Sequence, residues 1–173
     1  MANTVTVKLE IEGHFDQLAK IKDFVRSADS EFDFDKIASM PEDIRVLRNE
    51  NMTCDSDEYS IYREWLDENW GCHEPDFVSC KLEQRKLTYQ FHTNAPMPYP
   101  AILKLSSLFP ETTLVVYAED EFDRMQAMSR YHRGLYGITA NIICAGASIR
   151  KFTYPKIDFN ELRNLMNEGR SQA

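Results

Sequence analysis

The stretch from Tyr59 to Asp120 constrains the fold more than any other part of the chain. Its hydrophobic pattern changes period several times, from helical spacing to strand alternation and back. It predicts a helix, a β-hairpin, a second helix and a strand, over residues 59–70, 77–93, 100–109 and 113–119. An earlier strand and helix complete the order strand–helix–helix–strand–strand–helix–strand. This order is typical of a split βαβ, or ferredoxin-like, α+β domain with helices on one face of an antiparallel sheet.

The N-terminal segment supplies the first strand and the first helix. Residues 4–11 alternate apolar and polar side chains without interruption, which predicts a strand with one buried face. Leu18, Ile21 and Val25 then follow at helical spacing. We therefore expect a helix over residues 15–28.

The connection to the second helix is less regular. Phe32 and Phe34 alternate with acidic residues, which predicts a short extended edge. Pro41 is followed by two acids and favours a short helix that ends at Leu47. Residues 49–58 are polar and predict a surface loop.

The C-terminal third of the chain predicts an extension of the sheet. Residues 125–133 and 135–145 have the pattern of two strands, and Asp158 with Glu161 resembles the start of an amphipathic helix. The sequence thus divides into a ferredoxin-like domain over residues 1–122 and an extension over residues 123–173. We expect the extension, a β-hairpin and a helix, to pack on the same domain.

Composition limits the class of protein. The chain has 173 residues, of which 43% are hydrophobic, enough for a substantial core. It contains no apolar run of the roughly 18 residues that a membrane helix needs. The first residues also lack the basic and apolar regions of a signal peptide. We expect a soluble protein of the cytoplasm, in which the four scattered cysteines are free thiols.

Negative charge is concentrated in one segment. The formal net charge is −8, and residues 41–80 hold three basic and eleven acidic side chains, a difference of −8. This balance disfavours a general nucleic-acid binder, which normally carries a basic face. It is compatible with a docking surface for a basic partner, or simply with a solvated acidic face.

Three sequence features occur together. They are Phe32-Asp-Phe-Asp-Lys-Ile with Met40-Pro41-Glu42, a helix that ends in Trp70-Gly71 before a hairpin, and Phe109-Pro110 leading to a strand that ends in Tyr117-Ala118-Glu119. Over residues 3–122 these features resemble the YubB-type ferredoxin-like family of plasmid and phage proteins. The resemblance implies a ferredoxin-like fold and an origin in a mobile genetic element. It implies no catalytic residue.

Enzymatic chemistry has little support in the sequence. Cys54, Cys72, His73 and Cys80 could be considered as zinc ligands, but zinc sites usually draw ligands from close pairs such as C-x2-4-C. Cys72 with His73 could be considered as a nucleophile and base, but adjacent residues do not normally face each other. Nucleotide-binding and hydrolase motifs are absent from the sequence. We predict no cofactor and no metal site.

The favoured hypothesis is therefore a binding protein. It would bind a host protein or a protein–nucleic-acid complex, with no membrane partner, and inhibit a host defence of the anti-CRISPR or anti-restriction kind. Direct binding of nucleic acid is disfavoured by the charge. The acidic face that would make the contact consists of Glu42, Asp43, Asp55, Asp57, Glu58, Glu64, Asp67 and Glu68.

The alternative is a regulator that binds nucleic acid or a nucleotide through its sheet face and a basic C-terminal cluster. The cluster consists of Arg124, Arg130, Arg133, Arg150 and Lys151. Ferredoxin-like sheets can present aromatic rings to bases, and Tyr89 and Phe91 lie on the third strand, where such rings would sit. They share a strand face with Leu87, however, which predicts that they pack in the core.

Overall fold

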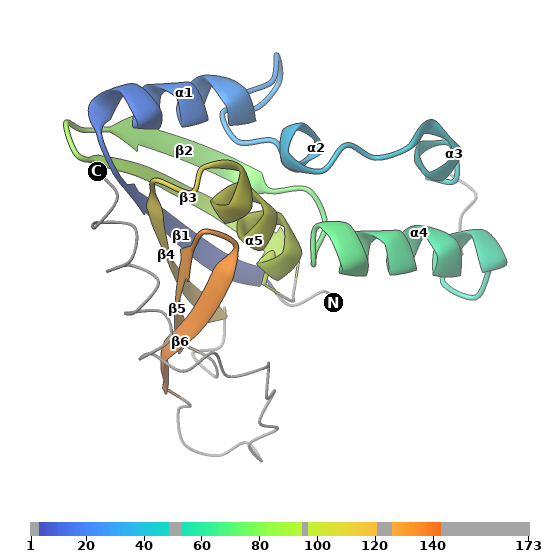
Figure 1. The fold of residues 1–173 in the computed structure, drawn as a ribbon. Helices are drawn as coiled ribbons and strands as arrows, with labels where there is room; N and C mark the ends of the chain where they lie inside the picture. The colour runs from blue at the N-terminus through green and yellow to red at the C-terminus, as the bar shows by residue number, and fades with distance from the viewer. Residues whose placement is uncertain (1–3, 49–52, 95–96, 121–125, 143–173) are drawn as a thin grey trace.

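The computed structural model describes residues 4–48, 53–94, 97–120 and 126–142. Its centre is a six-stranded antiparallel sheet with the order β2-β3-β1-β4-β5-β6 (Figure 1). The strands are β1 Thr4–Glu12, β2 Asp76–Leu82, β3 Lys86–Asn94, β4 Thr113–Asp120, β5 Gln126–His132 and β6 Leu135–Ile142. The helices are α1 Phe15–Val25, α2 Phe34–Ile37, α3 Glu42–Arg45, α4 Asp57–Asn69 and α5 Tyr99–Leu108. The α+β class is therefore confirmed.

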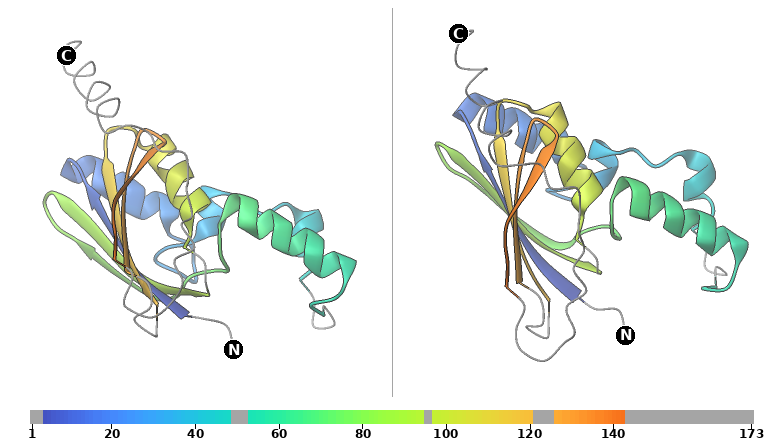
Figure 2. Two further views of the ribbon diagram at one scale, coloured as in Figure 1. Left: turned by 90° about the horizontal axis from the view of Figure 1, so that it is seen from below. Right: turned by 60° about the horizontal axis from the view of Figure 1, so that its bottom comes forward.

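The sheet has one face against helices and one polar face. Along β1, β3 and β4 the residues turned toward α1 and α5 are fully buried, among them Leu9, Tyr89 and Val116. Neighbouring residues on the same strands, such as Thr6 and Gln90, are exposed. The described helices gather on one side of the strands (Figure 2). We call the polar side the open face; its residues include Thr6, Lys8, Glu10, Glu12, Lys81, Lys86, Thr88, Gln90, His92, Tyr117, Glu119 and Arg130.

Phe32 and Phe34 do not form an extended edge, so that prediction was wrong. The Asp33 side chain accepts a hydrogen bond from the backbone N–H of Asp35 at 2.8 Å and caps the single turn of α2. Both phenylalanine rings are fully buried, and the Phe32 ring stacks on that of Phe91 with centroids 5.2 Å apart. Burial of each ring stabilises the fold by about 1.5–3 kcal/mol, which outweighs a local preference for an extended chain.

Helix α4 confirms the second predicted helix and begins earlier than expected. The hydroxyl of Ser56 accepts a hydrogen bond from the N–H of Tyr59 at 3.1 Å, so the helix starts at Asp57, inside the predicted loop. It ends at Asn69, and Gly71 two residues later has φ +83° and donates its N–H to the carbonyl of Leu66 at 2.7 Å. Helix α1 in turn ends at Val25, three residues before the predicted end.

Strands β5 and β6 confirm the two strands predicted after residue 124. They continue the sheet beyond β4, joined by a tight turn at Arg133 and Gly134, both of which have positive φ. The helix predicted from Asp158 lies outside the described residues. Within the described part of the chain, no helix has both the length and the apolar content to cross a membrane.

A candidate docking surface on the α3–α4 lobe

Helices α3 and α4 pack against each other and project away from the sheet (Figures 1 and 2). We call residues 41–48 and 53–71 the α3–α4 lobe. All eight acidic residues predicted to form the docking face are exposed on it. The structure thus brings together, on one projecting unit, acids that the sequence spreads over 27 positions.

The three arginines of this region each pair with an acid. Arg45 contacts Asp35 at 2.8 Å and Glu42 at 3.6 Å, and Arg63 contacts Asp67 at 3.0 Å. Arg48 contacts Glu74 at 2.7 Å. The other six predicted acids form no ion pair with any described residue: Asp43, Asp55, Asp57, Glu58, Glu64 and Glu68. Among the described residues, these six carboxylates of the lobe therefore have no ion-pair partner.

One exposed stripe of α4 joins three of these acids. Asp57, Ile61, Glu64 and Glu68 follow at intervals of four, three and four residues, so they lie on one side of the helix. Ile61 in the middle is 49% exposed. Glu64 and Glu68 repel each other, and the last turn of α4 contains no basic residue that would complement the helix dipole. Glu64 and Glu68 are therefore placed unfavourably for the stability of the free protein, whereas Asp57 in the first turn is placed favourably.

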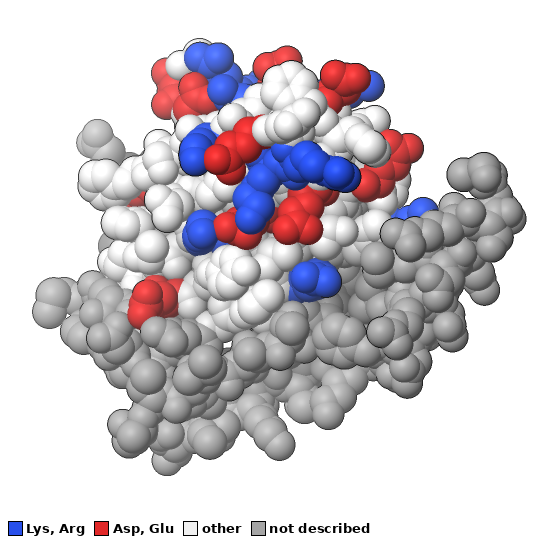
Figure 3. Space-filling model, turned by 90° about the vertical axis from the view of Figure 1, so that its left-hand side faces the viewer, with Lys and Arg blue, Asp and Glu red and all other residues white. Residues whose placement is uncertain are grey.

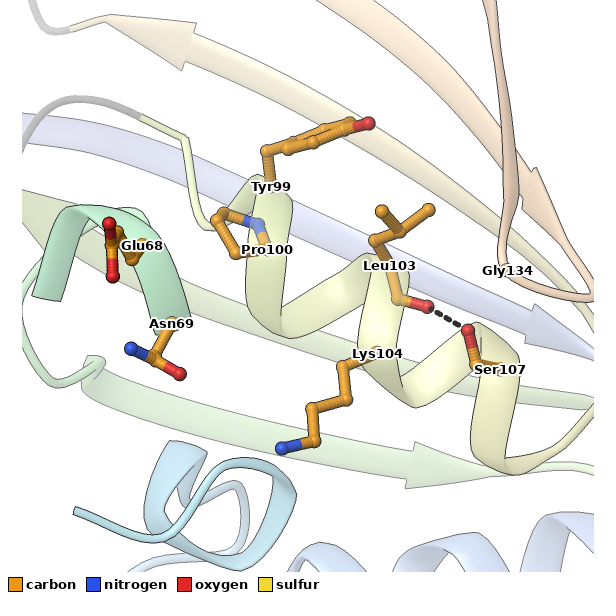
Figure 4. Close-up of a pocket in the computed structure, with 8 residues that line it drawn as sticks. All are labelled: Glu68, Asn69, Tyr99, Pro100, Leu103, Lys104, Ser107 and Gly134. Atoms are coloured by element: carbon orange, nitrogen blue, oxygen red, sulfur yellow. Dashed lines mark hydrogen bonds between the residues drawn. The ribbon is translucent and has the colours of Figure 1, made fainter. Parts of the chain in front are cut away.

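The stripe ends beside a shallow hollow of about 450 Å³ between α4 and α5 (Figure 4). Tyr99, Pro100 and Leu103 give it an apolar lining. Glu68 lies on the α4 side and Lys104 on the α5 side. A partner bound along the acidic stripe would therefore contact the apolar lining of the hollow at the end of the stripe.

Cys72 and His73 do not form a reactive pair. Cys72 is fully buried, and this burial raises the pKa of its thiol, so the sulfur stays protonated at neutral pH. His73 lies 3.4 Å from Arg63, measured from Nε2 to Nη1, and burial lowers the pKa of its imidazole. Within the described ranges, no three His, Cys, Asp or Glu side chains are placed to hold a metal ion.

The alternative site is only partly described. Arg130 and Arg133 are exposed, on β5 and in the turn after it, while Arg124, Arg150 and Lys151 lie outside the described residues. Tyr89 and Phe91 are buried beneath the helices, which confirms the prediction that they pack in the core. These two rings are therefore not available for stacking on a base.

The open face carries a second, polar hollow of about 340 Å³. Among its lining residues, Glu10 contacts Lys8 at 2.8 Å and Lys86 at 3.0 Å. The hydrogen bond from Lys8 lowers the pKa of the Glu10 carboxyl. Figure 3 shows basic and acidic side chains interspersed on one side of the molecule, without a large patch of either sign.

Comparison with known proteins gives one structural likeness. No family model matches the chain, and no curated protein matches it in sequence. Among solved structures, it is similar to one described as the crystal structure of a protein api92 from Yersinia pseudotuberculosis, family DUF1281. The TM-score is 0.48 at 7% sequence identity, and the match covers 86% of this chain and 100% of the other.

Proposed function

We propose that this protein is a stoichiometric binding protein that docks its α3–α4 lobe on a basic surface of a host protein or protein–nucleic-acid complex. The observation that carries the proposal is the set of six exposed acids that no described arginine or lysine neutralises. A basic partner surface would supply the missing countercharges. Such complementarity speeds association and selects the partner.

The shape of the lobe supports this mode of binding. Four of the six acids, Asp57, Glu58, Glu64 and Glu68, are fixed on helix α4. Their backbone positions are set before the partner arrives, so little backbone entropy is lost on docking. Ile61 and the apolar hollow beside Glu68 add apolar surface, and burying this surface against the partner would stabilise the complex. The burial of Cys72 disfavours a thiol nucleophile at this position.

We further propose that β1 to β4 form a ferredoxin-like unit. The order β2-β3-β1-β4, antiparallel throughout, is the one expected when helices connect β1 to β2 and β3 to β4. The resemblance to the YubB-type family rests on this region. It leads us to propose a mobile-element protein that acts in the host cytoplasm and inhibits a host defence of the anti-CRISPR or anti-restriction kind.

Affinity capture from host lysate tests the proposal. Tagged protein is incubated at about 50 and 200 mM salt, because screening weakens exposed charge interactions over this range. The test variant reverses Asp43→Lys, Glu64→Lys and Glu68→Lys. The control variant reverses Glu12→Lys, Asp23→Lys and Asp29→Lys, which are exposed acids outside the lobe. Both variants change the net charge equally.

We expect the wild-type protein to capture one host complex at low salt and to release it at high salt. The lobe variant should lose this complex while the control variant keeps it. Equal capture by the lobe variant would show that the acids are not the contact. Inhibition of host defence is then measured with the same three proteins in a phage-infection assay, where only the lobe variant should fail.

A further inference from the structure

Phe77 is held in an unfavourable position for an aromatic residue. Its φ is +53°, a left-handed conformation that disfavours any residue with a β-carbon. It lies where the pairing of β2 with β3 shifts register, between Asp76 and Ser79. The side chain is 84% exposed, so burial does not compensate for the strain. Backbone strain of this kind is found preferentially at binding and active sites.

The bulge places the Phe77 ring beside a ring of the open face. Its centroid lies 5.4 Å from that of His92 on β3. A second exposed aromatic, Tyr117 on β4, is 39% exposed and has the Lys8 ammonium 5.7 Å from its ring centroid. The open face therefore presents two separate ring platforms, and neither involves the buried rings Tyr89 and Phe91.

The strand order fixes the separation of the two platforms. β2 and β4 stand three strand positions apart and β3 and β4 two, so at about 4.8 Å per step Phe77 and His92 lie about 14 and 10 Å from the strand of Tyr117 across the sheet. A few nucleotides of an extended single strand span these distances. A base could then stack on each platform, since every base has a π-face.

The groups between the platforms suit a nucleotide backbone and base edges. Gln90 and Thr88 provide amide and hydroxyl groups at the polar hollow. Lys8 and Lys86 share the single carboxylate of Glu10, which leaves this trio with one net positive charge. Arg130, exposed on β5 opposite Val115, forms no ion pair with a described residue. These cations stand among carboxylates, since Glu12 lies opposite Lys86 and Lys81 contacts Glu83 at 2.6 Å, so phosphates would contact individual cations and not a basic patch.

We propose that the open face binds single-stranded nucleic acid, with bases stacked on Phe77 with His92 and on Tyr117, and phosphates beside Lys8, Lys86 and Arg130. This site is distinct from the α3–α4 lobe, which projects from the helix-covered side of the sheet. Its polar, hydrogen-bonding surface between the rings fits bases better than the apolar side of a protein segment. A partner that is a protein–nucleic-acid complex would engage both surfaces.

Fluorescence anisotropy with labelled oligonucleotides of about twelve nucleotides tests this site, a length within the range that single-strand-binding folds cover. The probes are single-stranded DNA, single-stranded RNA and a DNA duplex, each at about 50 and 200 mM salt. The variants are Phe77→Ala and Tyr117→Ala. Phe15→Ala is the control, because Phe15 on α1 is 50% exposed and lies away from the open face. Thermal melting checks that each variant is folded.

We expect the protein to bind both single strands more tightly than the duplex. Phe77→Ala and Tyr117→Ala should each weaken binding about 5- to 150-fold, the fold-change expected for loss of one base-stacking ring, while Phe15→Ala binds like the wild type. Reversal of the lobe acids should leave this binding intact. A difference between DNA and RNA would identify the sugar that the site prefers.

Three results would overturn the proposal. One is a lack of oligonucleotide binding at low salt, and another is binding that neither ring substitution weakens. The third comes from sedimentation of the protein alone. If the protein self-associates, loses this association with Phe77→Ala and binds no oligonucleotide, the open face is a contact between two copies of the chain.

Discussion

The indole nitrogen of Trp70 donates a hydrogen bond to the backbone carbonyl of Ala38 at 2.8 Å, deep in the protein. Trp70 follows the last turn of α4 and Ala38 follows α2, and both side chains are buried. This bond therefore fastens the base of the α3–α4 lobe to the helical layer. Because α4 projects from the sheet, the lobe depends on such contacts for its position.

Replacing Trp70→Phe should destabilise the protein by about 1–3 kcal/mol, since the Ala38 carbonyl would remain buried without its donor. Urea denaturation measures this change. Trp65→Phe is the matched control, because Trp65 is only partly buried and its indole N–H forms no hydrogen bond within the described chain. Equal losses in the two variants would mean that ring volume, and not the hydrogen bond, accounts for the effect.

Gly71→Ala should lower the melting temperature more than Gly13→Ala. A β-carbon at Gly71 would come 2.6 Å from Cδ of Pro100 and 2.8 Å from the carbonyl oxygen of Met97, at a φ of +83°. The left-handed conformation alone costs an alanine about 1–2 kcal/mol. At Gly13 the nearest atom would be a side-chain methyl of Thr112 at 3.0 Å, and φ is not in the left-handed range. Similar melting temperatures would contradict the tight approach of α4 to α5.

Phe77→Gly should stabilise the free protein while weakening oligonucleotide binding. Glycine tolerates φ +53°, and relief of the strain is partly offset by the greater freedom of glycine in the unfolded chain, leaving a gain of about 0.5–1 kcal/mol. Phe77→Ala keeps a β-carbon and should show no such gain. Chemical denaturation separates the two variants. A destabilised Phe77→Gly would indicate that the ring contributes more to packing than its exposure implies.

The stability of the fold should decrease in acid partly through Glu10. Its pKa is lowered in the folded protein, first by the hydrogen bond from Lys8, from an ordinary value of 4.5. A lowered folded pKa contributes stability that is complete above the unfolded pKa and is lost as the pH falls through the folded pKa. Wild-type stability should therefore decline below about pH 4.5. Glu10→Gln should be less stable at neutral pH and show a shallower decline, measured by denaturation from pH 7 to 3.

Local patterns were sufficient to predict most of the secondary structure. The alternation of residues 4–11, the helical spacing before Trp70 and the glycine at 71 each act over a few neighbouring residues, so the sequence alone reveals them. Phe34 was misplaced because its conformation depends on rings from β3, far along the chain. The boundaries of α1 and α4 depended on single residues, such as the cap at Ser56.

The candidate sites were less predictable. The exposure of the eight acids followed from their spacing on a helix and in loops, but the pairing of Arg48 with Glu74 depends on tertiary structure. Phe77 and Tyr117 were missed as exposed rings for the same reason. Strand alternation assigns a residue to one of two faces, and only the assembled sheet determines which face the helices cover. The bulge that exposes Phe77 interrupts the alternation on which the prediction relied.

The acidic stripe of α4 predicts that a substitution at Glu68 raises the stability of the free protein and weakens binding. Glu68 lies in the last turn of α4, where the partial negative charge of the helix end repels it, and Glu64 lies one turn earlier with the same charge. Glu68→Lys removes both repulsions and places a cation where the dipole favours one. The free protein should gain about 0.3–1 kcal/mol at low salt, and less at high salt, where screening weakens both effects.

The same substitution should weaken capture of the partner, because Glu68 lies at the junction of the acidic stripe and the apolar hollow. Asp23→Lys provides the control for the change in net charge, since Asp23 is exposed on α1 and outside the lobe. Denaturation and affinity capture on the same two variants measure the effect on stability and the effect on binding. If Glu68→Lys were stabilised and still captured the partner fully, the stripe would be an ordinary solvated surface. If it gained stability and lost the partner, the unfavourable placement of Glu68 would be explained by binding.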